Sequence, residues 1–158
     1  MRYMGLDLGT RTLGITLSDT SKLIASTYKT IRFNDSDYDS LLPQLALVVK
    51  EYNVSKIVLG LPKNMNNSIG ERGETTLNFQ KKLQKYLGIE VVMQDERLST
   101  VEATNYMLEA DISRKKRKKK IDSLAANIIL QTYLDKERNR LWKKKEWHLK
   151  YLMMKEKK

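Results

Sequence analysis

The stretch YMGLDLGTRTLGITLSD at residues 3–19 contains two apolar segments separated by a short turn. Residues 3–8 and 13–18 both have the apolar and β-branched composition of strands, and residues 9–12 (GTRT) have the composition of a tight turn between them. Residues 23–33 add a third segment of strand composition. The sequence therefore predicts that the chain begins with a three-stranded antiparallel meander.

Helix and strand patterns alternate after the meander. Apolar side chains at helical spacing predict a helix over residues 41–52, with Pro43 near its first turn, where proline is tolerated. The segment SKIVLGL at residues 55–61 is typical of a buried strand, and residues 74–87 predict a helix that ends at Gly88. This order of elements implies right-handed crossovers between strands of one sheet.

The second half of the chain continues the alternation. Residues 89–93 (IEVVM) predict a fifth strand, and Ser99 or Thr100 can cap the helix that follows it. The last helix is predicted from an apolar stripe of Ile121, Leu124, Ala125, Ile128 and Leu134. We expect an α/β fold with a mixed five-stranded sheet flanked by helices. No linker divides the chain, so we expect one domain over residues 1–135 and a basic, helical C-terminal extension over residues 136–158.

The formal net charge of +11 is unevenly distributed. The run RKKRKKK at residues 114–120 contributes +7 and residues 136–158 contribute another +7, which leaves the rest of the chain at −3. A basic run can be a solvated surface and nothing more. Seven consecutive cations repel one another, however, which favours a polyanionic partner such as nucleic acid.

The sequence also excludes several classes of protein. It contains no cysteine, so neither a disulfide framework nor a thiolate metal site can form. No apolar run is long enough for the core of a signal peptide or for a helix that crosses a bilayer. We therefore expect a cytoplasmic protein without a membrane partner.

Three carboxylates stand at the ends of predicted elements. Asp7 is at the end of the first strand, Glu96 follows the fifth strand, and Asp122 lies at the first turn of the last helix. Each has an ordinary explanation: a turn, a local ion pair and a favourable helix N-terminus, respectively. Together they would form a hard oxygen-ligand set that suits Mg²⁺ or Mn²⁺. Asp95 and Asp19 are possible further ligands.

Four segments of the chain resemble, in order and spacing, the YqgF family of RNase H-like proteins. The segments are MGLDLGTRTLGITLSD, IVLGLPKNMNNSIGERGE, DERLST and KIDSLAANIILQTYL, and they extend over about residues 1–135. Members of that family are described as Holliday junction resolvases and as pre-16S ribosomal RNA nucleases. The resemblance implies an RNase H-like core in which Asp7, Glu96 and Asp122 bind the metal and catalyse hydrolysis of phosphodiester bonds.

Several cationic and polar residues are candidates for contacts with nucleic acid. Thr10, Arg11, Lys63 and Arg97 lie in the matching motifs near the acids. The basic run is expected to be a cationic loop that guides phosphates toward Asp122, and it consists of Arg114, Lys115, Lys116, Arg117, Lys118, Lys119 and Lys120.

The expected function is processing of the 5′ end of pre-16S ribosomal RNA in ribosome biogenesis, by a monomer or a weak homodimer. One alternative is a Holliday junction resolvase acting on branched DNA, which would usually need a twofold dimer. Another is a non-catalytic RNA-binding module of ribosome assembly. The segment DLGTRTLG also resembles the phosphate loop of actin-like ATPases and sugar kinases, but those enzymes close two such domains around the nucleotide.

The extension also carries large apolar side chains among its lysines, namely Trp142, Trp147, Leu149 and Leu152. Aromatic residues among cations can stack on unpaired bases. They can equally attach an amphipathic helix to the domain, to another protein or to a ribosomal surface. We expect the extension to pack as a helix, with contacts from its lysines to RNA in addition.

Overall fold

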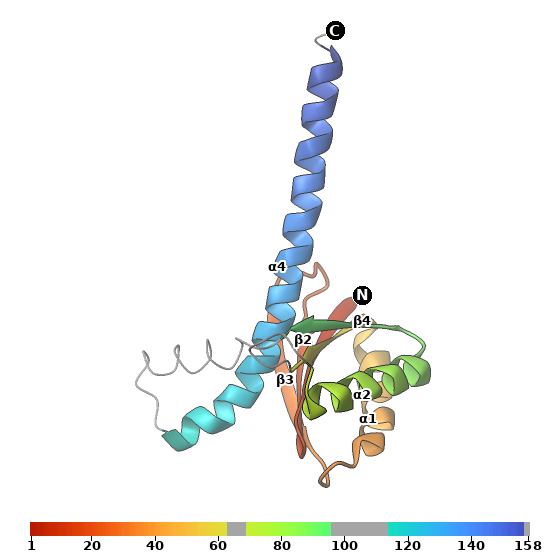
Figure 1. The fold of residues 1–158 in the computed structure, drawn as a ribbon, viewed down its shortest axis with the longest axis vertical. Coiled ribbons are helices and arrows are strands. Elements are labelled where there is room, and N and C mark those ends of the chain that lie inside the picture. Colours follow the sequence, from red (N-terminus) through yellow and green to blue (C-terminus); the bar gives the residue numbers. More distant parts are fainter. Residues whose placement is uncertain (63–68, 96–113, 157–158) are drawn as a thin grey trace.

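The computed structural model describes residues 1–62, 69–95 and 114–156 (Figure 1). In the last range, side chains are described for residues 125–141 and 143–155. The elements in chain order are β1 (Arg2–Leu8), β2 (Thr12–Ser18), β3 (Ala25–Arg32), the 3₁₀ helix η1 (Tyr38–Ser40), α1 (Leu41–Tyr52), β4 (Val54–Leu61), α2 (Glu71–Leu87), β5 (Glu90–Asp95) and α4 (Arg114–Glu156). The helix predicted after Ser99 or Thr100 lies outside the described residues.

The five strands form one mixed sheet in the order β3-β2-β1-β4-β5. β2 pairs antiparallel with both β1 and β3, which confirms the predicted meander. β4 pairs parallel with both β1 and β5. The ends of β1, β4 and β5 therefore meet at one edge of the sheet, while β2 ends at the opposite edge.

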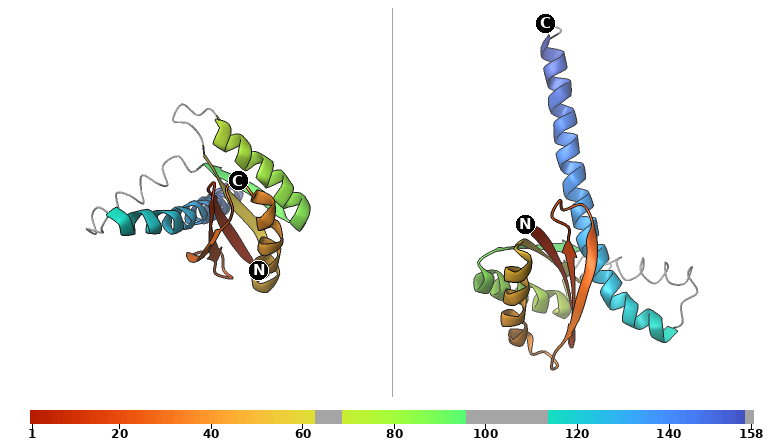
Figure 2. Two further views of the ribbon diagram at one scale, coloured as in Figure 1. Left: turned by 90° about the horizontal axis from the view of Figure 1, so that it is seen from below. Right: turned by 180° about the vertical axis from the view of Figure 1, so that it is seen from behind.

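Helices cover both faces of the sheet, with α1 and α2 on one side and α4 on the other (Figure 2). Because side chains alternate along a strand, Met4, Leu6 and Leu8 of β1 face α1 and α2 in the larger apolar core. The intervening residues of β1 face α4, where Val58 packs with Leu130 in a second apolar cluster. Each fully buried leucine in these layers contributes roughly 1.5–3 kcal/mol through burial.

Glycine at position 5 allows α4 to lie directly on the sheet. A Cβ atom built on Gly5 would come within 2.5 Å of Thr16 Cγ2 and 2.7 Å of Leu130 Cβ, with the Ala126 carbonyl oxygen at 3.3 Å. Thr16 is held in turn because its hydroxyl is 2.7 Å from the Ser26 carbonyl oxygen and 3.0 Å from Asn127 Oδ1. The space between β1 and α4 is thus too small for any side chain.

α4 runs antiparallel to β1. Ala126 and Leu130 lie against Gly5, and Tyr133, further along the helix, has its ring 6.2 Å from that of Tyr3 near the start of the strand. At the same end, the Lys56 ammonium is 3.1 Å from the Tyr133 hydroxyl. The buried face of α4 includes Ile129 and Leu130, whereas Ile128 of the predicted stripe is only half-buried.

The sequence-based boundaries of α4 are wrong at its N-terminus. The helix begins at Arg114 and contains the whole basic run of residues 114–120, which was expected to form a loop. Asp122 therefore lies about two turns into the helix and not in its first turn. The apolar pattern begins only near Ile121, so it gives no sign of the charged turns that precede it.

The C-terminal part of α4 extends beyond the sheet as a single projecting helix (Figure 1). A helix of 43 residues is roughly 65 Å long, whereas a seven-residue strand spans roughly 23 Å, so α4 is longer than the face it covers. Trp147 is 66% exposed and Leu149 is 60% exposed. The expectation that these side chains fasten the extension to the domain is therefore wrong. Within the described ranges, no helix is long and apolar enough to cross a membrane.

The contact at Gly5 generates a prediction about stability. Gly5→Ala should lower the free energy of unfolding by about 1–3 kcal/mol, because the added methyl group forces β1 and α4 apart. Denaturant unfolding measures this loss, and amide hydrogen exchange should become faster in residues 125–134.

Gly88→Ala is a matched control for that change. Gly88 has a φ of +68°, and a Cβ there would have no neighbour within 4 Å, so alanine introduces backbone strain without a collision. The strain should cost about 1–2 kcal/mol and leave exchange in α4 unchanged relative to the rest of the domain. Wild-type stability and wild-type exchange for Gly5→Ala would contradict the close packing.

Candidate functional site

The edge where β1, β4 and β5 end is held together by the start of α2. Arg72 Nη2 donates a hydrogen bond of 2.7 Å to the carbonyl oxygen of Leu8, the last residue of β1. Gly73 lies so close to the end of β4 that a Cβ there would be 2.9 Å from the Pro62 carbonyl oxygen. α2 therefore begins beside two of the three strand ends. Sequence reasoning missed Arg72, although it lies in one of the four family motifs.

Asp7 lies at this edge on the face covered by α4. It is the next-to-last residue of β1, is half-buried, and is opposite Gly14 of β2. It follows Tyr3 and Gly5 at alternate positions, and both of those residues contact α4. The strand thus places the Asp7 carboxylate between the sheet and the N-terminal half of α4.

Asp122 belongs to the part of α4 that approaches Asp7, and only its backbone is described. Ala126 lies against Gly5, and Asp122 is one helical turn before Ala126, or roughly 6 Å along the axis. Asp7 is two residues beyond Gly5, or roughly 7 Å along the strand. Because helix and strand run antiparallel, both steps go in the same direction, so we expect the turn that contains Asp122 to lie toward Asp7.

Asp95 occupies the end of β5 but lies on the other face. Val91 and Met93 pack in the core with α1 and α2, whereas Val92 packs in the cluster against α4. Alternation along the strand therefore places Asp95 on the α1 and α2 side, opposite Asp7. Glu96, the next residue, lies outside the described residues, as do Lys63 and Arg97.

Asp19 is not brought near Asp7, because β2 ends at the opposite edge. The register pairs Asp7 with Gly14, so Asp19 is five residues further along β2, or roughly 17 Å away. Its carboxylate accepts hydrogen bonds from the Ser21 hydroxyl and from the backbone N–H groups of Leu23 and Ile24. The bond from Ser21, then those from Ile24 and Leu23, lower the pKa of Asp19 to about 2. Asp19 therefore organises its own turn and shares no ion with Asp7.

The turn after β1 is fixed through its backbone. The Gly9 N–H donates to the Thr12 carbonyl at 2.7 Å, and the Thr10 and Arg11 carbonyls accept from the backbone N–H groups of Ser36 and Phe33. The Thr10 and Arg11 side chains are exposed. Arg11 is 3.7 Å from Asp35, but both side chains are largely in solvent, so this ion pair is weak.

The donor atoms present at this edge fit a hard divalent cation. Asp7 supplies a carboxylate, and the chain has no cysteine and only one histidine, His148, which lies in the projecting part of α4. Oxygen ligands of this kind suit Mg²⁺ or Mn²⁺. Within the described residues no group of three potential ligands occurs, and Asp7 is the only one of the three predicted acids whose side chain is described.

The chain is similar to known proteins over most of its length. A family model described as "RuvX: Holliday junction resolvase" matches residues 1–136. Two proteins of Staphylococcus aureus, from strains JH9 and JH1, are named "Putative pre-16S rRNA nuclease". Each is 50% identical to this chain over 135 residues, which is 85% of this chain and 95% of the relative.

Solved structures share the fold at low sequence identity. RuvC of T. thermophilus in complex with a Holliday junction substrate is 12% identical, with a TM-score of 0.54, and the match covers 87% of this chain and 96% of RuvC. The fowlpox virus resolvase in complex with Holliday junction DNA is also 12% identical, with a TM-score of 0.51 and coverage of 86% and 98%. The fold is thus that of RuvC-like, RNase H-type resolvases, and the family match and the 50% identity together show that the chain belongs to the RuvX (YqgF) family.

Proposed function

We propose that this chain is a divalent-metal-dependent nuclease that processes the 5′ end of pre-16S ribosomal RNA in ribosome biogenesis. The observation that supports the proposal is the position of Asp7 at the end of β1, on the face of the sheet that α4 covers. Relatives at 50% identity carry the name of such a nuclease. The proposed ligands of Mg²⁺ or Mn²⁺ are Asp7, Glu96 and Asp122.

The position of Asp95 is the reason for assigning the third ligand role to Glu96. Asp95 lies on the face of the sheet opposite Asp7, and a carboxylate there cannot share an ion with one on the α4 face. Glu96 is also the residue indicated by the resemblance of the DER motif. The residues that bind the metal are thus supplied by two strand ends and one helix.

In this mechanism the chain provides positioning and charge. Metal bound by these carboxylates would lower the pKa of an attacking water and offset the charge on the leaving oxygen of the phosphodiester. Asp7 is held in place by the pairing of β1 with β2, and Arg72 fixes the adjacent strand end. Thr10, Arg11, Lys63 and Arg97 are the proposed contacts to the flanking phosphates.

The basic run of residues 114–120 is the proposed phosphate grip beside this site. It occupies the first two turns of α4, so its members precede Asp122 by roughly 3 to 12 Å along the helix axis. Each phosphate that a cation neutralises releases condensed counterions, which provides affinity without sequence preference. The run would therefore hold the RNA backbone near the bond that is cut.

A Holliday junction resolvase is the second candidate, because the family model carries that description. Precursor RNA is preferred because the relatives named for it are 50% identical, whereas the resolvases of solved structure are 12% identical and show the fold alone. A non-catalytic RNA-binding module would need no acids at the strand ends. We further propose a cytoplasmic monomer or weak homodimer.

The metal site predicts the effect of removing single charges. Asp7→Asn should lower the cleavage rate at saturating RNA by at least a hundredfold, because the amide has nearly the same shape but cannot supply the charge that the cation requires. Binding measured in EDTA should change less than twofold. Glu96→Gln and Asp122→Asn should behave alike, and the double variants should lose little more than the single ones.

Asp95→Asn and Asp39→Asn are the matched controls. Each replaces a carboxylate with an amide at a position outside the proposed metal site. Asp39 is exposed, is 3.2 Å from the Lys82 ammonium, and belongs to η1, whose Tyr38 packs on the α1 and α2 side of the sheet. Both controls should retain cleavage within about threefold, as expected for a surface change. A large loss in Asp95→Asn together with normal turnover in Glu96→Gln would reverse the assignment of these two residues.

The choice of substrate can be tested directly. Purified protein should cleave a precursor RNA that contains the 5′ end of 16S ribosomal RNA and leave a four-way DNA junction intact, in Mg²⁺ and in Mn²⁺. Gel analysis of both substrates, with Asp7→Asn as the negative control, measures the difference. Symmetric cutting of the junction with intact RNA would instead favour the resolvase.

The basic run generates a prediction about salt dependence. Replacing Lys115, Lys116, Lys118 and Lys119 with Gln should weaken binding to unrelated RNAs about equally. The slope of log affinity against log salt should fall by roughly 0.7–0.9 for each phosphate that is no longer neutralised. Turnover at saturating RNA should change little. An unchanged slope with failed cleavage would mean that the run shapes the active site.

A further inference from the structure

Residues 136–158, here called the extension, lie almost entirely beyond the part of the chain that is shared with its relatives. The family match ends at residue 136, and the 135 aligned residues make up 95% of each S. aureus relative. Those relatives therefore have no counterpart of this length. Any function of the extension is an addition to the activity of the family.

Residues 136–156 of the extension are helical, and the extension as a whole is strongly cationic. It has ten lysines and arginines against three glutamates. Glu137 and Glu146 form ion pairs with Arg140 at 4.0 Å and with Lys150 at 3.4 Å. Among the described residues, no carboxylate lies within ion-pair distance of Lys143, Lys144 or Lys145. These charges repel one another along the helix, and a polyanion would relieve that repulsion.

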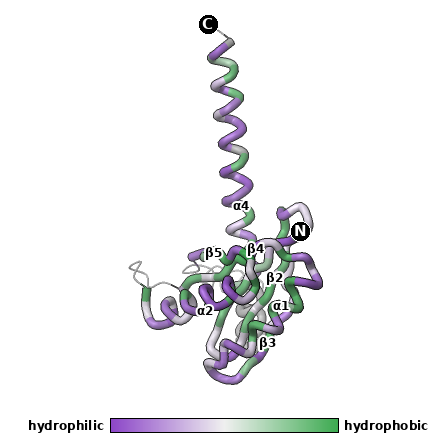
Figure 3. The backbone as a smooth tube through the Cα atoms, turned by 90° about the vertical axis from the view of Figure 1, so that its right-hand side faces the viewer, coloured by the Kyte–Doolittle hydropathy of each residue, from purple (hydrophilic) through white to green (hydrophobic). Residues whose placement is uncertain are grey.

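Hydrophilic and hydrophobic residues alternate along the extension (Figure 3). At 100° per residue, the widest sector of residues 136–156 without a charged residue spans roughly 80°. That is narrower than the apolar stripe by which an amphipathic helix lies on a membrane or in a protein groove. A partner that carries negative charge on several sides of the helix fits this distribution better.

Two aromatic rings on the extension are already arranged for stacking. The rings of Trp147 and Tyr151 are 5.7 Å apart between centroids and inclined by only 12°. Trp147 is 66% exposed and Tyr151 is 47% exposed, and no other element covers them in the described part of the chain. Exposed aromatic faces among lysines bind unpaired bases, with the cations on the adjoining phosphates.

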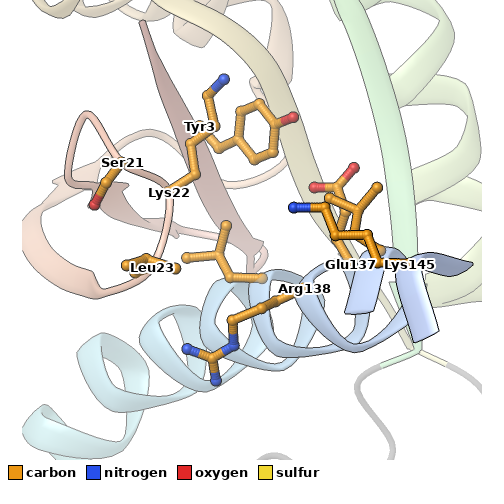
Figure 4. Close-up of a pocket in the computed structure, with 9 residues that line it drawn as sticks. Tyr3, Ser21, Lys22, Leu23, Glu137, Arg138 and Lys145 are labelled. Atoms are coloured by element: carbon orange, nitrogen blue, oxygen red, sulfur yellow. The ribbon is translucent and has the colours of Figure 1, made fainter. Parts of the chain in front are cut away.

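A cationic pocket lies where the extension leaves the sheet (Figure 4). Its volume is about 380 Å³, and Tyr3 and Lys22 line one side while Arg138 and Lys145 line the other. Glu137 is the one acidic residue of the lining, so three cations face one carboxylate. The Lys22 ammonium is 5.1 Å from the centroid of the Tyr3 ring. Such a pocket suits a phosphate or nucleotide. Sequence reasoning missed it, because it combines residues from both ends of the chain.

The turn that carries Lys22 is built rigidly. Lys22 has a left-handed φ of 61°, and its backbone N–H donates to the Asp19 carbonyl at 3.1 Å. The Asp19 carboxylate in turn binds the N–H groups of Leu23 and Ile24. Asp19 thus holds the turn from which the Lys22 side chain reaches the pocket. Because Asp19 lies at the end of the sheet opposite Asp7, it is not part of the proposed metal site.

We propose that the extension and this pocket form a second RNA-binding site, at the end of the sheet opposite Asp7. The identification of the ligand as RNA rests on the proposed function, while the case for a polyanion rests on the charges and aromatic pair alone. The pocket residue Tyr3 and Asp7 are four residues apart on β1, or roughly 13 Å, and the extension continues away from Asp7 beyond the pocket. The extension therefore holds a part of the RNA that is remote from the bond being cut, and the loop of a stem-loop there would supply unpaired bases to the aromatic pair.

The test compares two RNAs in EDTA, so that no cleavage occurs. One is a precursor fragment with a stem-loop next to the cleavage segment, whose loop supplies unpaired bases, and the other is the single-stranded cleavage segment alone. In the full-length chain, replacing Lys143, Lys144, Lys145 and Lys150 with Gln should weaken binding to the stem-containing RNA at least tenfold. The salt slope should fall by roughly 2–3, as expected when the phosphates facing these lysines are no longer neutralised. Binding to the short RNA should stay within twofold.

Two further variants separate charge from stacking and from general effects. Trp147→Ala with Tyr151→Ala should weaken binding to the stem-containing RNA at least fivefold with an unchanged salt slope, because stacking releases no counterions. The control replaces four exposed lysines of the domain, Lys29, Lys50, Lys81 and Lys85, with Gln and should bind within twofold of wild type. Circular dichroism checks that all three sets remain folded.

The outcomes distinguish this inference from the proposed function. If the wild type does not cleave precursor RNA but the extension variants still lose affinity, the nuclease proposal fails and the RNA site stands. If the lysine variant binds both RNAs like the control, the RNA site is refuted. Equal RNA binding, with a wild-type dimer that the variant converts to a monomer in sedimentation, would assign the extension to a second copy of the chain and also refute it.

Discussion

The close contact of α4 with β1 at Gly5 determines most of what this molecule can do. The Leu130 side chain and the Ala126 carbonyl occupy the space that a Cβ on residue 5 would fill. That contact fixes both the height and the direction of α4 over the sheet. The helix therefore runs from the Asp7 end of β1 toward Tyr3, where it leaves the sheet. One packing contact therefore positions the candidate metal site and the extension together.

The direction of each strand then decides which acids can act together. Because β1, β4 and β5 are parallel, their ends collect at one edge, and Asp7 and the end of β5 share it. β2 is antiparallel, so the acid that follows it is carried to the other edge. Side chains alternate between the two faces of the sheet along β5, which places Asp95 on the face opposite Asp7 and excludes it from the candidate metal ligands. Strand direction and side-chain parity thus reduce five candidate acids to three.

The sequence was sufficient for the elements in which local pattern and tertiary packing agree. The meander, α1 with Pro43 in its first turn, and the mixed sheet all match the expectations. The errors occur where the apolar pattern carries no information about the length of an element. The apolar spacing that defines α4 starts near Ile121, so the charged helical turns before it could not be predicted. Trp147 is an apolar side chain, and packing against the domain is the usual expectation for such a residue, but it is exposed. Trp147 lies in solvent because α4 is longer than the sheet that it covers, and no local sequence pattern encodes the length of the sheet. The side chains of Glu96 and Asp122 lie outside what the structure describes, and their roles remain proposals.

The charge distribution gives the two ends of the molecule complementary tasks. Apart from the run 114–120 and the extension, the chain carries a net charge of −3, so most of the domain surface repels a polyanion weakly. Nucleic acid is therefore attracted to the two cationic segments, and both belong to α4. Because a continuous helix connects them, the spacing between a phosphate grip near Asp122 and a contact on the extension is set by helix rise. The length of α4 would then set the distance on a bound RNA between the cleavage site at one end of the sheet and the contact with the extension at the other.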